Sequence, residues 1–241
     1  MRLKISLAAL DENPSIDLNY NYHLASLIYR SIERADRKLS LELHSPSGPK
    51  LLTFSRLFVP EKCFSIENGR MILEDSSVHF FFSSPLPELC EALVSGLLMK
   101  PEVRIGDARF GVSSIEVLKE RELRGREKFI TMSPIHVSSV EGSGVRRRKV
   151  DLYPDDPRFY EILRKNLVKK YIMLHGEPPE SDELEIEVLD TRAKMIRVKN
   201  TNNRCVEMVF LARGSRELME VGYKAGFGAK NSMGFGMVKV V

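Results

Sequence analysis

Apolar residues recur along this chain at two spacings, one typical of strands and one typical of helices. In the first half, the alternation in RLKISLAAL predicts a strand, and apolar positions between Tyr22 and Asp36 recur every three or four residues, as in an amphipathic helix. The later segments predict, in order, a loop with Ser45, Pro46, Gly48 and Pro49, strands at LLTFSRLFV, Met71 to Leu73 and Val78 to Phe82, a helix at PELCEALVSGLLM and a strand at FGVSSIEVL. The order β-α-β-β-α-β is that of the ferredoxin-like unit.

The second half predicts the same order of elements. We expect a helix from Pro157 to Leu174 and a short helix, SRELMEVGY, that begins after Ser215. The expected strands are KFITMSPIHV, then LEIEVLD and MIRVKN as a hairpin, then VEMVFLA and the closing FGMVKVV. The sequence therefore predicts an α+β fold of two tandem ferredoxin-like βαββαβ domains, residues 1–122 and 123–241, joined near ERELRGRE.

Length and composition exclude several classes of protein. With 241 residues and 43% apolar composition, the chain can bury a sizeable core in two small domains. We find no apolar run near the ~18 residues that a bilayer crossing needs, and no signal peptide, so a cytoplasmic protein is expected. The three cysteines, Cys63, Cys90 and Cys205, lie far apart, which argues against a disulfide framework or a zinc site.

Positive charge is concentrated in two segments, although the net charge is only +4. Residues 121–150 hold eight basic and three acidic side chains, and residues 191–204 hold five basic side chains and no acidic one. Such segments attract a phosphate backbone, although a solvated face is the commoner meaning of any single charge run. The candidate RNA contacts are Lys128, Arg146, Arg147, Arg148, Lys149, Arg192, Lys194, Arg197, Lys224 and Lys230. Strand alternation allows only some of them to point the same way.

Five glycines fall within fifteen residues near the C-terminus, at Gly222, Gly226, Gly228, Gly234 and Gly236. Such a loop lets the backbone approach a ligand and offers amide donors, and Lys224 and Lys230 add positive charge. The spacing fits neither a Walker loop nor a Rossmann fingerprint. Taken alone, the segment fits a plain glycine-rich turn as well as it fits a phosphate-contacting loop.

The segment GFGAKNSMGFG, at the end of a duplicated ferredoxin-like chain, resembles the signature of the CRISPR-associated protein six family. These are endoribonucleases of the RAMP superfamily that cut CRISPR repeat transcripts into guide RNAs. The resemblance implies that the glycine-rich loop lies near RNA and is not where the bond is cut. Because the sequence shows no cluster at metal-ligand spacing, a site without a metal or other cofactor is expected. The resemblance also implies cleavage by a Tyr, a His and a Lys of the first domain. The matching positions are Tyr29 late in the first helix, His44 in the loop that follows, and Lys50 before the next strand.

The chemistry of RNA cleavage without a metal explains why these residue types are wanted. A base takes the proton of the 2′-hydroxyl, a cation stabilises the charged phosphorane, and an acid protonates the departing 5′-oxygen. Histidine serves as acid or base near neutrality, whereas tyrosine needs a neighbouring cation. Each residue also has a structural alternative: Tyr29 as a core aromatic, His44 as an ordinary loop histidine and Lys50 as a solvated lysine.

The other histidines are expected to be structural or surface residues, because they are not clustered at metal-ligand spacing: His23, His79, His136 and His175. The chain has no tryptophan and no evident pair of stacking aromatics on a sheet, so RNA binding is expected to depend on backbone and shape. Two alternatives to the nuclease stay open, a protein that only binds the repeat and a structural subunit of an RNA-guided surveillance complex. Association with other CRISPR-associated proteins, or as a homodimer, is compatible with all three.

Overall fold

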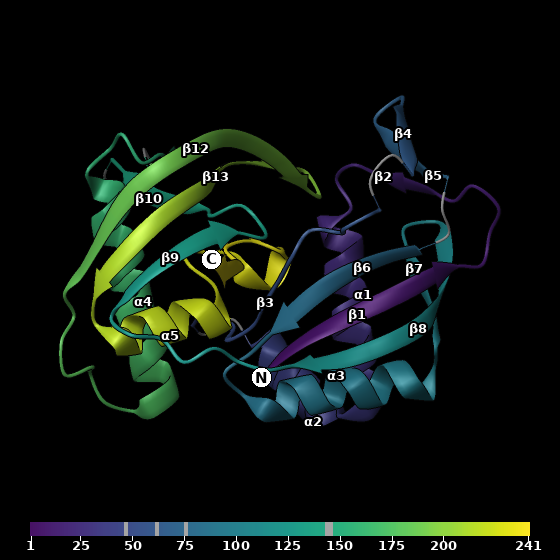
Figure 1. Ribbon diagram of the computed structural model, residues 1–241, viewed down its shortest axis with the longest axis horizontal. Coiled ribbons are helices and arrows are strands. Elements are labelled where there is room, and N and C mark those ends of the chain that lie inside the picture. The colour runs from purple at the N-terminus through teal and green to yellow at the C-terminus, as the bar shows by residue number, and fades with distance from the viewer. Residues whose placement is uncertain (46–47, 61–62, 75–76, 143–146) are drawn as a thin grey trace. The chain divides into compact units, whose positions relative to one another are not determined.

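Figure 1 shows the computed structural model, which describes residues 1–45, 48–60, 63–74, 77–142 and 147–241. In the first half of the chain the elements are β1 (Arg2–Ala9), β2 (Ser15–Asp17), α1 (Asn21–Ala35), α2 (Arg37–His44), β3 (Thr53–Phe54), β4 (Phe64–Glu67), β5 (Arg70–Leu73), β6 (Ser77–Ser83), α3 (Pro87–Met99), β7 (Glu102–Ile105) and β8 (Ala108–Leu118). In the second half they are β9 (Arg126–Thr131), β10 (Val137–Glu141), β11 (Arg148–Leu152), α4 (Arg158–His175), β12 (Leu184–Val198), β13 (Thr201–Gly214), α5 (Arg216–Ala225), the 3-10 helix η2 (Asn231–Met233) and β14 (Val238–Val240). Among the described residues, no helix is both long and apolar enough to cross a membrane.

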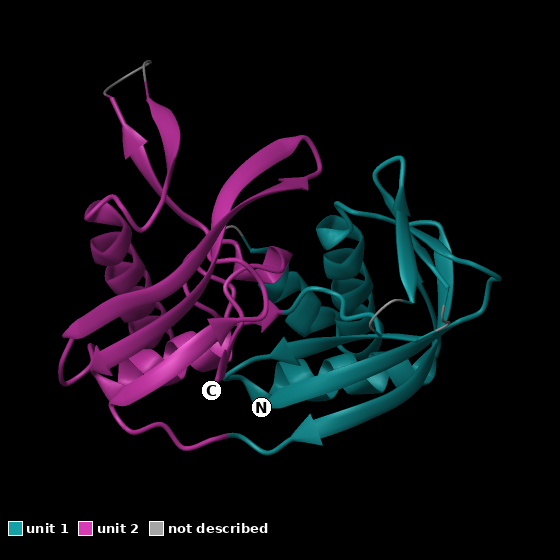
Figure 2. Ribbon diagram, turned by 45° about the horizontal axis from the view of Figure 1, so that its top comes forward, with its two compact units in different colours: residues 1–47, 55–120 teal, residues 48–54, 121–241 magenta. Residues whose placement is uncertain are grey.

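The chain divides into two compact units, which Figure 2 colours separately. The first comprises Met1–Ser47 and Ser55–Glu120, and the second comprises Gly48–Phe54 and Arg121–Val241. The short segment 48–54 groups with the second unit because the Thr53 hydroxyl donates to the Phe235 carbonyl at 3.0 Å, and the Ser133 hydroxyl donates to the Phe54 carbonyl at 3.0 Å. Residues 48–54 therefore group with the second unit, although they precede the domain boundary predicted after residue 122.

The first unit is built on the antiparallel strand order β6-β1-β8-β7. Alternate residues of β1, Leu3, Ile5 and Leu7, are fully buried, as the period of a strand with one apolar face requires. Helices α1 and α3 cross closely at Gly96, where a Cβ atom would lie only 1.8 Å from the Ser31 carbonyl oxygen. A small three-stranded sheet, β2-β5-β4, completes the unit.

The second unit has the sheet order β12-β13-β9-β14 and the chain order β9-α4-β12-β13-α5-β14. Its core includes three aromatic rings, those of Phe129, Phe210 and Phe227, whose centroids lie 5.4 to 5.5 Å apart. Strands β10 and β11 form a separate hairpin between β9 and α4. The predicted fold class, two tandem ferredoxin-like domains, is confirmed.

Two predictions about the first half are wrong. The stretch that contains His44 is not a loop but the helix α2, because Asp36 ends α1 in an extended conformation and its side chain accepts the backbone N–H of Leu39 at 2.9 Å. The expected strand LLTFSRLFV is reduced to the two residues of β3 and an isolated bridge between Phe58 and His79.

Two predictions about the second half are also wrong. LEIEVLD and MIRVKN do not pair with each other: both belong to the single long strand β12, which pairs with β13 across a turn at Lys199 and Asn200. KFITMSPIHV is not one strand, because β9 ends at Thr131 and β10 begins at Val137 on either side of Pro134.

Candidate functional site

Tyr29 and His44 meet where helix α2 folds back beside α1. Their ring centroids are 5.1 Å apart and their planes make an angle of 70°, an edge-to-face contact. Leu43 of α2 is buried, whereas the neighbouring His44 is exposed and Tyr29 is half-buried. The short turn at Asp36 between the two helices therefore brings together two titratable side chains that lie fifteen residues apart in the sequence.

The orientation of the His44 ring is fixed by one hydrogen bond. Its Nδ1 lies 2.7 Å from the carbonyl oxygen of Ser40, one turn earlier in α2. A carbonyl oxygen can only accept, so Nδ1 carries a proton and donates it. In the neutral ring Nε2 then holds the free lone pair, and this nitrogen is the one available to exchange a proton with a ligand.

Lys50 lies six residues after His44 in the sequence and belongs to the second unit. It is half-buried and lines a cavity of about 290 Å³ together with Lys169 and Asn166 of α4 and Lys230 of the glycine-rich loop. The carbonyl oxygen of the Asn166 side chain is buried there without a hydrogen-bond partner among the described residues. The cavity has no acidic residue in its described lining, so the surroundings of Lys50 favour an anion.

The glycine-rich loop is largely packed into the second unit. A Cβ atom at Gly228 would lie 2.5 Å from the His136 carbonyl oxygen, and one at Gly236 would lie 1.9 Å from the Phe227 carbonyl oxygen. Both glycines also have positive φ angles, of 73° and 77°, which L side chains rarely adopt.

Several amides of this loop already donate within the fold. Phe227 N–H donates to the Gly236 carbonyl, Ala229 N–H to the His136 carbonyl and Gly236 N–H to the Pro134 carbonyl, each at 2.8 Å. These three donors are not offered to a ligand. Gly222 lies within α5 and Gly234 ends η2 with a φ of 81°, so the glycines serve close packing and turns. Lys224 and the segment from Ala229 to Met233, except Asn231, are partly accessible.

Lys170 of α4 fixes the glycine-rich loop through hydrogen bonds, a role that was not predicted from the sequence. Its fully buried ammonium group donates to the carbonyl oxygens of Gly226 and Gly228, at 2.5 and 2.9 Å, and to Oδ1 of Asn231 at 2.7 Å. Burial lowers the pKa of Lys170 to about 7, while the three oxygen acceptors favour the ammonium form. The sequence nevertheless indicates that Lys170 is buried, because it continues the apolar row of Leu163 and Leu167 along α4.

His136 and Asp151 form a second buried connection. Nε2 of His136 lies 3.0 Å from Oδ1 of Asp151, and Oδ2 of the same carboxylate accepts the backbone N–H of Arg204 at 2.9 Å. Burial, with the charge of Lys149 nearby, lowers the pKa of His136 to about 4, and Asp151 offsets only part of that shift. The pair joins the β10–β11 hairpin to β13, which fits the predicted structural role of His136. His79 stacks on Phe58, and His175 lies over the Tyr171 ring.

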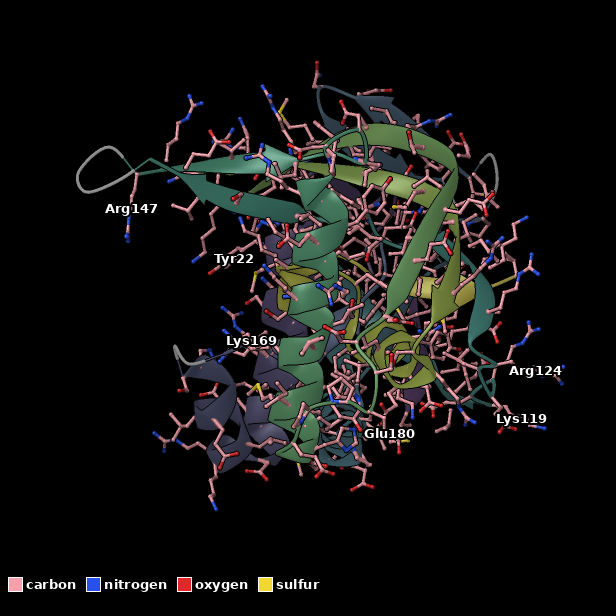
Figure 3. The ribbon with its side chains drawn as sticks, turned by 90° about the vertical axis from the view of Figure 1, so that its left-hand side faces the viewer. Tyr22, Lys119, Arg124, Arg147, Lys169 and Glu180 are labelled. Atoms are coloured by element: carbon pink, nitrogen blue, oxygen red, sulfur yellow. The ribbon has the colours of Figure 1, made fainter. Side chains whose placement is uncertain are left out.

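The basic hairpin is formed by β10 and β11, and Figure 3 shows Arg147 at its outer end. Arg146 lies outside the described residues. Arg147 and Lys149 are exposed, whereas Arg148 is paired with Glu141 at 3.3 Å, which also binds Arg158 at 2.8 Å. The positive charge of Arg148 is therefore partly neutralised within the fold.

The remaining basic candidates fall on different faces of the second sheet. Arg192 and Lys194 share one face of β12, and Arg197 lies on the other, as strand alternation requires. Lys194 is paired with Glu207 at 3.4 Å. Lys128 on β9 is exposed, and Lys230 donates to Oδ1 of Asn203. In the part of the chain that the structure describes, no group of three His, Cys, Asp or Glu side chains is arranged to hold a metal ion.

Comparisons with known proteins agree over the whole chain. Residues 15–116 match the family model described as CRISPR-associated protein Cas6, N-terminal, and residues 118–240 match the model of the Cas6 C-terminal part. The chain is 41% identical over 243 residues to the CRISPR-associated endoribonuclease Cas6 of Pyrococcus furiosus, an alignment that covers 100% of this chain and 90% of that protein.

Two solved structures are similar over the same length. One, from the characterisation of a Cas6-related gene of Pyrococcus furiosus, has a TM-score of 0.92 and 35% identity and covers 100% of this chain and 98% of that one. The other, described as a RAMP protein binding different RNA substrates, has a TM-score of 0.90 and 35% identity and covers 100% and 99%.

Proposed function

Because this chain belongs to the Cas6 family of CRISPR-associated endoribonucleases, we propose that it binds CRISPR repeat RNA and cleaves it without a metal ion. The RNA partner is supported by a relative of 35% identity that is described as binding different RNA substrates. The observation that carries the catalytic part of the proposal is the contact between Tyr29 and His44, with the His44 ring oriented by Ser40.

The reaction needs no group beyond the RNA and side chains that move protons. The 2′-oxygen attacks the adjacent phosphorus as its proton passes to a base, and the bond from phosphorus to the 5′-oxygen breaks as that oxygen receives a proton from an acid. The products are a 2′,3′-cyclic phosphate and a 5′-hydroxyl. Two groups that exchange protons on opposite sides of one phosphate are sufficient for both transfers.

We assign the two proton transfers to Tyr29 and His44. The Ser40 carbonyl binds Nδ1–H, so Nε2 is the nitrogen of His44 that takes or gives the proton. The same hydrogen bond holds the ring at a fixed angle, which preserves the geometry of the transfer. Lys50 is assigned the stabilisation of the phosphorane charge because of the family resemblance, and its cavity without acidic residues supports a role next to an anion.

We propose that RNA is held mainly through its backbone. Arg147 and Lys149 of the hairpin, Lys128 of β9 and Arg192 of β12 are exposed cations, which suits phosphate contacts. Lys230 lines the cavity that also contains Lys50, so the partly accessible end of the glycine-rich loop is proposed as a further phosphate contact. Other CRISPR-associated proteins and a second copy of this chain are proposed only as further partners.

A labelled repeat RNA, incubated with the protein in excess chelator, tests this proposal. We expect cleavage to continue, with a 2′,3′-cyclic phosphate on one product and a 5′-hydroxyl on the other. A substrate with 2′-deoxyribose at the cut site should bind and stay whole, since the attacking oxygen is missing. Cleavage that stops in chelator and returns with magnesium would contradict the metal-independent mechanism.

The same experiment separates the nuclease from the two alternatives. A protein that only captures the repeat would bind the labelled RNA tightly and leave it uncut under every condition. A structural subunit of a surveillance complex would also leave the RNA uncut and would associate stably with other proteins. Binding without cleavage by the purified chain would therefore replace the proposed function with one of these two.

A further inference from the structure

We propose that a basic cavity on the first unit, between α1 and β7, binds backbone phosphates of the RNA next to the cleaved bond. The proposal rests on the proposed function and adds a contact surface outside the candidate residues of the second half. The cavity has a volume of about 590 Å³. Its cationic and aromatic lining comprises Tyr22, His23, Arg30, Arg34, Lys100 and Arg104.

The charge of this cavity is poorly balanced by the protein itself. Four arginine and lysine side chains face a single carboxylate, that of Glu102, among the described residues of the lining. Arg30 and Lys100 form no ion pair with any residue that the structure describes. Cations gathered in one hollow without matching acids repel one another, and a bound anion relieves that repulsion.

Neighbouring groups do not supply the missing negative charge. Asp11 is close enough to Arg104 for the two charges to interact, but its carboxylate is held by the Arg109 guanidinium at 2.7 Å. Arg34 donates to the carbonyl oxygen of Gly96 at 2.8 Å, which fixes its head group and leaves its charge unpaired by any described carboxylate. The cavity therefore offers partly pre-positioned positive charge.

The cavity shares helix α1 with the candidate catalytic tyrosine. Tyr22, Ser26 and Arg30 follow each other at four-residue spacing and so form one row along the helix. Tyr29 directly precedes Arg30, about 100° around the helix, and Tyr22 lies about 10 Å further along the axis from Tyr29. An RNA strand cut at Tyr29 and His44 can thus continue along α1 into the cavity within a few nucleotides.

Two exposed aromatic rings in the cavity lining, those of Tyr22 and His23, favour RNA over a small anion as the ligand. Tyr22 is 37% exposed, and its ring meets the His23 ring at 5.8 Å with an angle of 64°. Exposed rings beside cations are the combination that binds single-stranded RNA, in which bases stack while phosphates are neutralised. We therefore assign to the cavity single-stranded nucleotides that flank the cleavage position.

Binding of an uncleavable repeat RNA, with 2′-deoxyribose at the cut site, tests the proposal. The double variant R30A/K100A should bind more weakly than wild type, and the slope of log K against log salt should become shallower by about 1.4, at about 0.7 per phosphate contact on a single strand. K119A is the matched control, because Lys119 is an exposed lysine of the same unit outside the cavity, and its slope should equal that of wild type (Figure 3). A wild-type slope in R30A/K100A would overturn the proposal.

A second pair of measurements identifies the ligand and protects the result from misfolding. Tyr22→Leu should weaken binding of the full repeat but not of an RNA trimmed close to the cut on both sides. If R30A/K100A lost binding of adenosine monophosphate and kept the wild-type salt slope for RNA, the cavity would serve a small anion and the proposal would fall. Thermal melts equal to wild type show that the variants fold.

The outcomes also separate this proposal from the proposed function. If wild type cleaves the RNA and R30A/K100A keeps the wild-type slope of log K against log salt, the cavity assignment is wrong and the nuclease proposal stands. Uncut RNA in every condition combined with a shallower slope in R30A/K100A would defeat the nuclease proposal and leave the cavity assignment intact. At limiting protein the double variant should cut more slowly, in proportion to its weaker binding of RNA, because the lost contacts hold substrate and transition state alike.

Discussion

The ring of Tyr29 meets the ring of His44 edge to face, with centroids 5.1 Å apart, although the residues lie on different helices. Asp36 makes this possible by ending α1 and capping α2 within one residue. The Ser40 carbonyl then sets the direction of the His44 ring. The geometry proposed for proton transfer therefore depends on Asp36 and Ser40 as well as on the two rings.

His44→Ala should slow single-turnover cleavage by about 100-fold to 10,000-fold, the usual contribution of general acid-base catalysis. Affinity for the repeat RNA should hardly change, because the imidazole acts mainly in the transition state. His175→Ala is the matched control, since His175 ends α4 in the second unit and stacks on Tyr171. Cleavage by His44→Ala at the wild-type rate would show that the site is assigned wrongly.

Tyr29→Phe and Lys50→Ala should each lower the single-turnover rate more than the affinity for RNA. The first removes one hydroxyl and keeps the ring that contacts His44, and the second removes one charge. Combined with His44→Ala, either change should cost less than the product of the single effects, because groups that act as a unit are not additive. Fully multiplicative effects in the double variants would indicate independent roles.

Arg147→Ala should reduce the salt dependence of RNA binding by about one phosphate contact. Arg148→Ala should reduce it less, because the Arg148 side chain is already paired with Glu141. Binding measured from low to moderate salt gives both slopes, and the triple change with Arg146→Ala gives the total for this run. An unchanged slope in the triple variant would mean that the hairpin is only a solvated surface.

Lys170→Met should lower the free energy of unfolding by about 2 kcal/mol or more. Three buried oxygens, those of Gly226, Gly228 and Asn231, lose their donor, at about 1–3 kcal/mol for each unsatisfied group, while removal of the buried charge offsets part of the loss. Lys169→Met, at the exposed neighbouring position, should stay within about 0.5 kcal/mol of wild type. Urea unfolding of both variants measures the difference in unfolding free energy. Equal urea midpoints for the two variants would contradict a stabilising role for the Lys170 hydrogen bonds.

The stability of the protein should fall as pH drops from about 6.5 to about 4. Burial lowers the pKa of His136 to about 4, so the unfolded chain binds a proton on this residue first as the pH decreases. The loss from this group should reach at most about 3 kcal/mol. His136→Gln keeps a donor toward Asp151 and removes the titration, so its unfolding free energy should change less over this range. Parallel pH profiles for the two proteins would contradict the assignment.

The sequence alone determined the main helices and strands of the fold and the family of the protein. Apolar period predicted β1, α1, α3, α4 and α5, because long amphipathic segments leave little choice of structure. The resemblance in the glycine-rich tail predicted the family, which the comparisons confirm. Local pattern was less informative at α2, where the cap at Asp36 and the spacing of Leu39 and Leu43 signalled a helix that the polar context obscured.

Tertiary structure decided what the polar residues do, because their partners lie far away in the chain. The period of α4 places Lys170 in its apolar row, but only the fold shows that Gly226 and Asn231, some sixty residues away, accept its hydrogen bonds. From the sequence, Arg148 is predicted to contact RNA like its neighbours in the basic run. Only the register of the hairpin, which places it opposite Glu141, shows that its charge is paired within the protein. The composition of a segment and the spacing of its apolar residues indicate its charge and its apolar face. Its hydrogen bonds and its burial depend on which distant segments the fold brings together.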